Sequence, residues 1–80
     1  MMKPALRASE AADLIERFLN GNGLYPQEWN DFIEGVRVEK AVEPYRKKCY
    51  ALDPLVNRPG RPDGRAMEEL KTIVSKLRRI

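Results

Sequence analysis

The sequence predicts an all-α fold, a compact bundle of about four short helices in one small domain. Three observations support this prediction. The chain has 80 residues, which suits a single domain with one core. Apolar residues recur at spacings of three and four in four segments, as on one face of a helix. No segment alternates apolar and polar residues in the way that a half-buried strand does.

The composition excludes two broad classes of protein. With 42% hydrophobic and 34% charged residues, the chain is too apolar for a disordered tail and too charged for a membrane protein. Its uncharged runs are shorter than the ~20 apolar residues of a membrane span, and residues 1–7 lack the apolar stretch of a secretory signal. We therefore expect a soluble, cytoplasmic protein that makes no contact with a membrane.

The first helix is predicted from about Ser9 to Asn20. Ser9 is a good N-cap, and the acidic Glu10 is favoured near the positive end of the helix dipole. Gly21 or Gly23 can take the left-handed conformation that ends a helix. The apolar face of this helix consists of Ala11, Leu14, Ile15, Phe18 and Leu19.

The second helix is predicted to begin at Pro26 and to end near Gly35. Proline is favoured at the first position of a helix because the N–H group that it lacks would have no partner there. The apolar face consists of Trp29, Phe32, Ile33 and Val36.

Two starts are open for the third helix. It begins near Glu43 with Pro44 at its first position, or a longer helix kinks at Pro44. We favour the first, because proline disfavours helix in the residue before it. The residues that share one face are Val38, Val42, Tyr45, Cys49 and Leu52.

Two segments are expected to lie outside the helices. Residues 1–8 are expected to be flexible, and residues 53–63 form a loop in which Leu55 and Val56 anchor the chain to the core. Prolines and a glycine interrupt helical structure in this loop. They are Pro54, Pro59, Gly60 and Pro62.

The last helix has the clearest pattern. Asp63 or Gly64 caps its start, acidic residues follow early, and basic residues come late, as the helix dipole favours. Its apolar arc consists of Met67, Leu70, Ile73, Val74, Leu77 and Ile80.

The residue inventory argues against catalysis. The chain has no histidine, which removes the commonest general base near neutral pH and most zinc sites. The single cysteine, Cys49, lies on an apolar helical face and is expected to be buried and unreactive. No glycine-rich segment matches a phosphate-binding loop. We therefore expect no enzymatic activity, no cofactor and no metal site.

Basic residues concentrate in the second half of the sequence. Residues 1–44 carry five basic and eight acidic side chains, a net charge of −3, whereas residues 45–80 carry ten basic and four acidic ones, a net charge of +6. Two interpretations are open: a solvated surface beside the acidic half in the fold, or a surface that contacts a polyanion. The residues expected to contact phosphates in the second case are Arg58, Arg61, Arg65, Lys76 and Arg79.

The segment Arg58-Pro59-Gly60-Arg61-Pro62 resembles a distorted AT-hook, a minor-groove motif centred on Arg-Gly-Arg-Pro. Here Pro59 separates the first arginine from Gly60, so the two arginines are three positions apart rather than two. We interpret the segment as a stiff loop that positions the last helix.

The segment Pro26-Gln27-Glu28-Trp29-Asn30-Asp31-Phe32-Ile33, followed by Pro44 to Cys49, resembles a pattern in small uncharacterised bacterial helical proteins. In those proteins a Pro-x-Glu-Trp-x-Asp-Phe-Ile segment precedes a second helix that ends in a basic stretch and a cysteine. The resemblance covers roughly residues 10–53. It implies a bacterial cytosolic origin and assigns no activity or site residue.

These observations favour a non-enzymatic protein-binding module, such as a small regulator, adaptor or immunity-like protein, that acts through its helical surface. A core this small leaves apolar surface uncovered, which another protein or a second copy of the chain would cover. The residues expected to face such a partner are Tyr25, Tyr50 and Leu55, at segment edges. The alternative is a nucleic-acid-binding protein that uses the basic C-terminal half.

Overall fold

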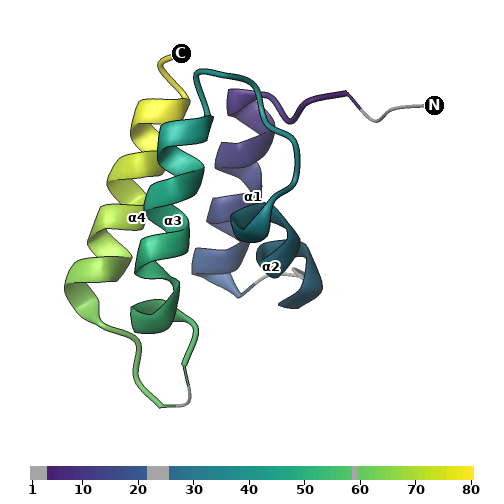
Figure 1. Cartoon of the computed structure of the whole chain (residues 1–80). Helices are drawn as coiled ribbons and strands as arrows, with labels where there is room; N and C mark the ends of the chain where they lie inside the picture. Colours follow the sequence, from purple (N-terminus) through teal and green to yellow (C-terminus); the bar gives the residue numbers. More distant parts are fainter. Residues whose placement is uncertain (1–3, 22–25, 59) are drawn as a thin grey trace.

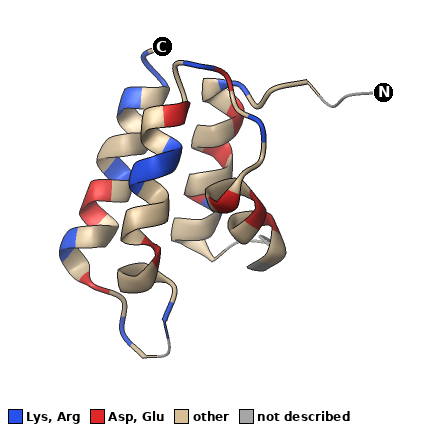
Figure 2. Ribbon diagram, in the orientation of Figure 1, with Lys and Arg blue, Asp and Glu red and all other residues tan. Residues whose placement is uncertain are grey.

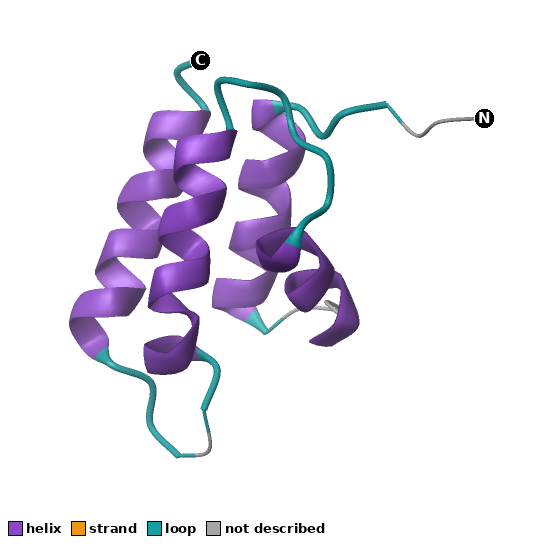
Figure 3. Cartoon of the chain, in the orientation of Figure 1, coloured by secondary structure: helices purple, strands orange, loops and turns teal. Residues whose placement is uncertain are grey.

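The chain forms four α-helices in a computed structural model that describes residues 4–21, 26–58 and 60–80 (Figure 1). The helices are α1 (Ala8–Asn20), α2 (Pro26–Glu34), α3 (Glu43–Val56) and α4 (Gly64–Leu77). Figure 3 shows only helices and loops, and none of the described residues belongs to a strand. The predicted all-α bundle of about four short helices is confirmed.

The helices pack as a small bundle in which α1 and α4 lie side by side and antiparallel (Figure 1). α3 packs antiparallel to α4, and the short α2 lies against α1 and α3. The radius of gyration is 11.9 Å, close to the roughly 12 Å of a compact domain of this length. None of the described helices is long and apolar enough to cross a membrane.

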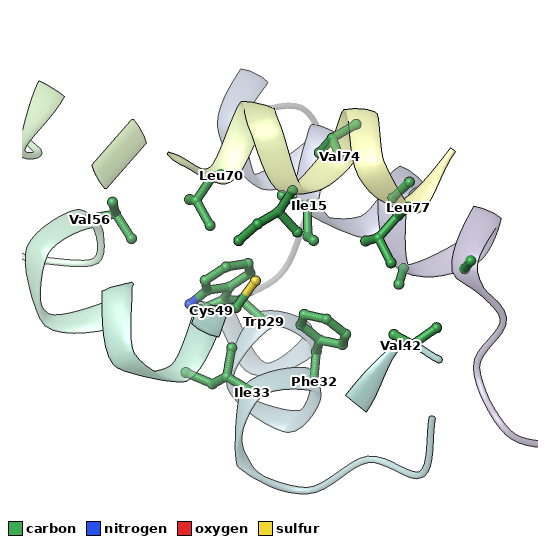
Figure 4. Close-up of a cluster of buried hydrophobic side chains, with 14 of the residues drawn as sticks. Ile15, Trp29, Phe32, Ile33, Val42, Cys49, Val56, Leu70, Val74 and Leu77 are labelled. Atoms are coloured by element: carbon green, nitrogen blue, oxygen red, sulfur yellow. The ribbon is translucent and has the colours of Figure 1, made fainter. Parts of the chain in front are cut away.

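The core lies between the inner faces of the helices, and every fully buried side chain in the described part of the chain is apolar. Figure 4 shows Trp29 and Phe32 of α2 beside Cys49 of α3, with Leu70 of α4 close to them. The predicted apolar faces therefore supply this core. The largest fully buried side chains are Trp29, Phe32, Ile15, Leu70, Leu77, Val42 and Cys49.

The start of α1 differs from the prediction, because Arg7 and not Ser9 is the N-cap residue. The Arg7 backbone is extended, and its N–H donates to Glu10 Oε1 at 3.1 Å while its side-chain Nε donates to the same oxygen at 3.2 Å. These hydrogen bonds hold the pKa of Glu10 below its usual value. Because Glu10 reaches back to residue 7, the helix begins one residue before Ser9.

Leu6 fixes the segment ahead of α1 to the connection between α2 and α3. Its N–H donates to the Arg37 carbonyl at 2.9 Å, and its carbonyl accepts from Glu39 N–H at 2.9 Å, in an isolated parallel bridge. The side chain of Leu6 also packs on the core. Of the segment expected to be flexible, residues 1–3 lie outside the described residues.

The predicted ends of the first two helices are confirmed at Gly21 and Gly35. Gly21 has a φ of 66°, the left-handed conformation that glycine adopts without strain, whereas Gly23 lies outside the described residues. Gly35 and Val36 both donate their N–H groups to the Asp31 carbonyl beyond the last turn of α2. Val36 is therefore past the helix and 38% exposed, not on its apolar face.

α3 begins at Glu43 with Pro44 in its first turn, as predicted, and continues to Val56. The loop thus starts at residue 57 and not at residue 53. Pro54 lies in the last turn and removes only the hydrogen bond to the carbonyl of Tyr50, a residue that water reaches. Val56 is buried as expected of an anchor, but Leu55 is 41% exposed.

Asp63 caps α4 as predicted, because its Oδ1 accepts the N–H of Ala66 at 2.9 Å. The predicted apolar arc is buried or half-buried from Met67 to Leu77. Ile80 was expected to complete this arc and is instead 63% exposed. The helix ends at Leu77, so the helical spacing no longer directs Ile80 toward the core.

Trp29 joins three of the helices. Its ring stacks on Phe18 of α1 with centroids 3.9 Å apart and planes inclined by 9°. Its Nε1–H donates to Asp53 Oδ1 of α3 at 2.8 Å, and the side chain is almost fully buried. The buried indole N–H thus has its hydrogen-bond partner on a different helix.

Replacing Asp53 with alanine should lower the free energy of unfolding by about 1.5–3 kcal/mol, because the buried N–H of Trp29 loses a charged acceptor. Asp53→Asn keeps an oxygen at the same place and should cost less. Urea unfolding followed by the fluorescence of Trp29 measures both variants. An Asp53→Ala variant as stable as the wild type would show that this hydrogen bond does not hold α2 on α3.

Candidate binding surface

The single cysteine does not provide a reactive site. Cys49 is fully buried in the core, as predicted, and burial raises the pKa of its thiol from 9.0 to about 12. The nucleophilic thiolate is therefore disfavoured in the folded chain at neutral pH. Among the described residues, no group of three or more cysteine, aspartate or glutamate side chains could hold a metal ion.

Cys49 should react slowly with a thiol reagent such as DTNB in the native protein and fast after unfolding. Cys49→Ser should lower the free energy of unfolding by about 1–3 kcal/mol, because it places a hydroxyl in an apolar site. Fast labelling of the native protein, together with an unchanged stability of the serine variant, would identify a reactive thiol instead.

The same thiol should make stability depend on alkaline pH. Above pH 9.0 the unfolded chain ionises Cys49, whereas the folded chain keeps it protonated up to a pH of about 12. The stability contributed by the raised pKa is complete below pH 9.0 and is lost as the pH rises toward 12. Cys49→Ala is the control, because it lacks this part of the pH dependence.

The five residues expected to contact phosphates are all exposed, and none of them has an ion-pair partner among the described residues. Arg58 and Arg61 lie in the loop before α4, where Arg58 Nε donates to the Arg61 carbonyl at 3.2 Å. Arg65 and Lys76 lie near opposite ends of α4, about 16 Å apart along its axis, and Arg79 follows its end. The five form a long strip over the loop and the length of α4.

Other cations are neutralised within the fold. Arg78, which follows α4, contacts Asp13 and Glu16 of α1, with both distances 2.9 Å. Arg46 of α3 pairs with Glu43 and donates from Nη1 to the Ile33 carbonyl at 2.6 Å. The acidic half therefore lies beside part of the basic half, in agreement with one of the two interpretations of the charge pattern.

Two basic residues that sequence reasoning did not select lie on the exposed side of α3. Lys47 and Lys48 follow Arg46 directly, are both exposed and have no ion-pair partner in the described part of the chain. The side chain of Arg46, in contrast, is only 15% exposed. The sequence signal was their position beside the buried Cys49, since neighbours of a buried helical residue point away from it.

Figure 2 shows the resulting distribution of charge: basic segments predominate on α3, α4 and the loop between them, and acidic segments predominate on α1 and α2. The difference in net charge between the two halves of the sequence is therefore also a difference between two sides of the folded chain.

Two of the three residues expected to face a partner are exposed on α3. Tyr50 is 58% exposed and Leu55 is 41% exposed, whereas Tyr25 lies outside the described residues. Ala51 and Pro54, between them in sequence, are exposed as well. We call these four residues and Lys47 the α3 outer face. Lys47, Tyr50, Ala51 and Pro54 follow the spacing of one helical side, and Leu55 flanks them.

A shallow hollow of about 290 Å³ adjoins the α3 outer face where α3 meets α2. Tyr50 and Lys47 line it together with Ile33, Glu34 and Arg46. Arg46 is held there by Glu43 and the Ile33 carbonyl, so its position is fixed. The hollow thus offers a partner a place beside the exposed tyrosine ring.

A larger hollow of about 520 Å³ between α1 and α4 is less suited to binding. Its charged residues Glu16 and Lys71 already pair with Arg78 and Glu68. Its apolar residues, Leu19, Met67 and Val74, are buried or half-buried against the core.

Comparison with known proteins gives no assignment: no family model, curated protein or solved structure matches the chain.

Proposed function

We propose that the protein is a non-enzymatic binding module that docks another protein on the α3 outer face. The observation that carries this proposal is the exposure of Tyr50 and Leu55 on one helix, with Ala51 and Pro54 between them. Exposed apolar side chains gathered on one helix are typical of interaction surfaces. Tyrosine is favoured there because it offers a large rigid ring with a polar tip.

The attachment of α3 to the rest of the fold supports the proposal. Three hydrogen bonds join α3 to neighbouring segments along its length: from Arg46 to the Ile33 carbonyl, from Trp29 to Asp53, and from Asp63 N–H to the Leu55 carbonyl at 2.9 Å. A surface that is held in place before binding loses little conformational entropy on binding. The α3 outer face meets this condition.

The proposed role is that of a small regulator, adaptor or immunity-like protein in a bacterial cytoplasm. The lack of histidine and the inaccessible thiol support a non-enzymatic role without a cofactor. A single cysteine that cannot form an intrachain disulfide is typical of a reducing compartment.

A photo-activatable phenylalanine analogue in place of Tyr50 should cross-link the protein to its partner in the cells that naturally express it. The same analogue at Asn20, exposed at the end of α1, is the control and should give little product. Adding Leu55→Ser should reduce the Tyr50 product by about tenfold, the effect of losing one contributing interface residue.

The Leu55→Ser variant should lower the free energy of unfolding by about 1 kcal/mol, because Leu55 is 41% exposed and serine is a weaker helix former than leucine. A lost product reflects lost binding when urea unfolding shows that the purified variant is still folded. Equal cross-linking from Tyr50 and Asn20, or a product insensitive to Leu55→Ser, would contradict docking on this face.

A nucleic-acid-binding protein is the second candidate, favoured by the five exposed cations without ion-pair partners in the described chain. Phosphates would neutralise them in a salt-dependent way. Against it stands their spread along α4, where Glu68 and Glu69 interrupt the strip.

A titration with duplex DNA separates the two candidates. We expect only the weak non-specific affinity of a basic surface, with a Kd of ~10⁻⁴–10⁻⁶ M at physiological salt. The control is the triple reversal of Arg65, Lys76 and Arg79 to glutamate, which should leave the fold intact because all three are exposed. Tight binding that the reversal destroys would replace the protein-docking proposal with the second candidate.

A further inference from the structure

The surroundings of the α3 outer face carry a pronounced positive charge. Lys47 and Lys48 lie at its N-terminal end, and Arg58 and Arg61 lie just beyond its C-terminal end. The apolar side chains of Tyr50 and Leu55 stand between these two basic ends. Lys47 and the last residue of α3, Val56, are separated by about 13 Å at the helical rise, and Arg58 follows two residues later in the loop.

The acidic residues nearest in the fold are largely occupied elsewhere. Asp53 accepts the indole N–H of Trp29, and Asp63 caps α4. Glu43 pairs with Arg46, an interaction that also holds the pKa of its carboxyl below the usual value. Glu34, which lines the hollow beside Tyr50, is the acidic exception. None of the four cations at the two ends forms an ion pair in the described chain, although Lys47 lies close enough to Glu43 for its charge to help lower the pKa of that carboxyl.

From this arrangement we infer that the partner docked on the α3 outer face is an acidic protein segment, with apolar residues that cover Tyr50 and Leu55 and carboxylates that meet the two basic ends. The inference rests on the proposed function and adds the chemistry of the partner. Carboxylates opposite Lys47, Lys48, Arg58 and Arg61 supply electrostatic complementarity, which speeds association and selects against basic partners.

The position of the apolar residues favours protein over nucleic acid. Protein interfaces commonly have an apolar centre with aromatic residues and a polar, charged rim. The α3 outer face has this order, with Tyr50, Ala51, Pro54 and Leu55 at the centre and basic residues at both ends. A phosphate backbone is instead bound by cations and polar donors along its path, and Leu55 and Pro54 would leave a gap in it.

Selection from a random peptide library displayed on phage tests the inference directly. We expect the selected peptides to be rich in aspartate and glutamate and to carry apolar residues at helical spacing. Their affinity should fall at least about tenfold when Lys47 and Lys48 are both changed to glutamate, and should also fall with rising salt. The matched control changes Arg37 and Lys40 to glutamate, an equal change in charge at exposed positions before α3.

The outcomes separate the inference from the proposed function. Peptides without an acidic bias that still lose binding to Leu55→Ser and Tyr50→Ser would overturn the acidic partner and leave the docking surface standing. Peptides insensitive to Leu55→Ser and Tyr50→Ser, or no selected peptides at all, would overturn the docking surface too. A duplex DNA competitor that displaces the peptides at similar concentration would assign the surface to nucleic acid and overturn both.

Discussion

The rest of the structure depends on the double attachment of Trp29. One short helix, α2, reaches both long neighbours through this side chain, by stacking on Phe18 of α1 and by donating a hydrogen bond to Asp53 of α3. Because Trp29 is held at two points, the contacts fix both the position of α2 and its rotation about its own axis. Arg46 adds a second connection from α3 to α2 one helical turn before Cys49. Because these contacts hold one side of α3 inward, the opposite side has to face solvent.

The same attachments determine where charge is left over. Two acidic residues of α1, Asp13 and Glu16, form ion pairs with Arg78 at the C-terminal end of α4. Exposed ion pairs of this kind contribute only about 0–1 kcal/mol, so their main consequence is the distribution of charge rather than stability. They leave the cations of α3 and of the loop after it without carboxylates of α1 beside them. Exposed positive charge and exposed apolar side chains therefore lie together on α3.

Sequence reasoning predicted the structure correctly where a local signal and the packing of the core agree. It did not predict features that depend on contacts between residues far apart in the sequence. Helical spacing predicted four helices and the burial of Cys49, and a local carboxylate predicted the Asp63 cap. The extent of α3 was not predictable from composition, because the cost of Pro54 depends on whether the Tyr50 carbonyl can reach water. The pairing of Arg78 with Asp13 joins residues 65 positions apart, and no local pattern marks it.

The candidate surface shows the same division between local pattern and tertiary context. Tyr50 was selected because it was expected at the edge of a segment, whereas it lies inside α3, which continues to Val56. Lys47 was not selected, although its position relative to Cys49, which was predicted to be buried, already placed it on the exposed side of the helix. The structure makes the difference by turning Arg46 inward to a backbone carbonyl and a carboxylate. Arg46 then works as a structural tie, while Lys47 keeps its charge at the surface. Neighbouring residues of one chemical type thus take opposite roles. The contacts that hold Arg46 inward also fix the outer side of α3, the surface on which we propose that a partner docks.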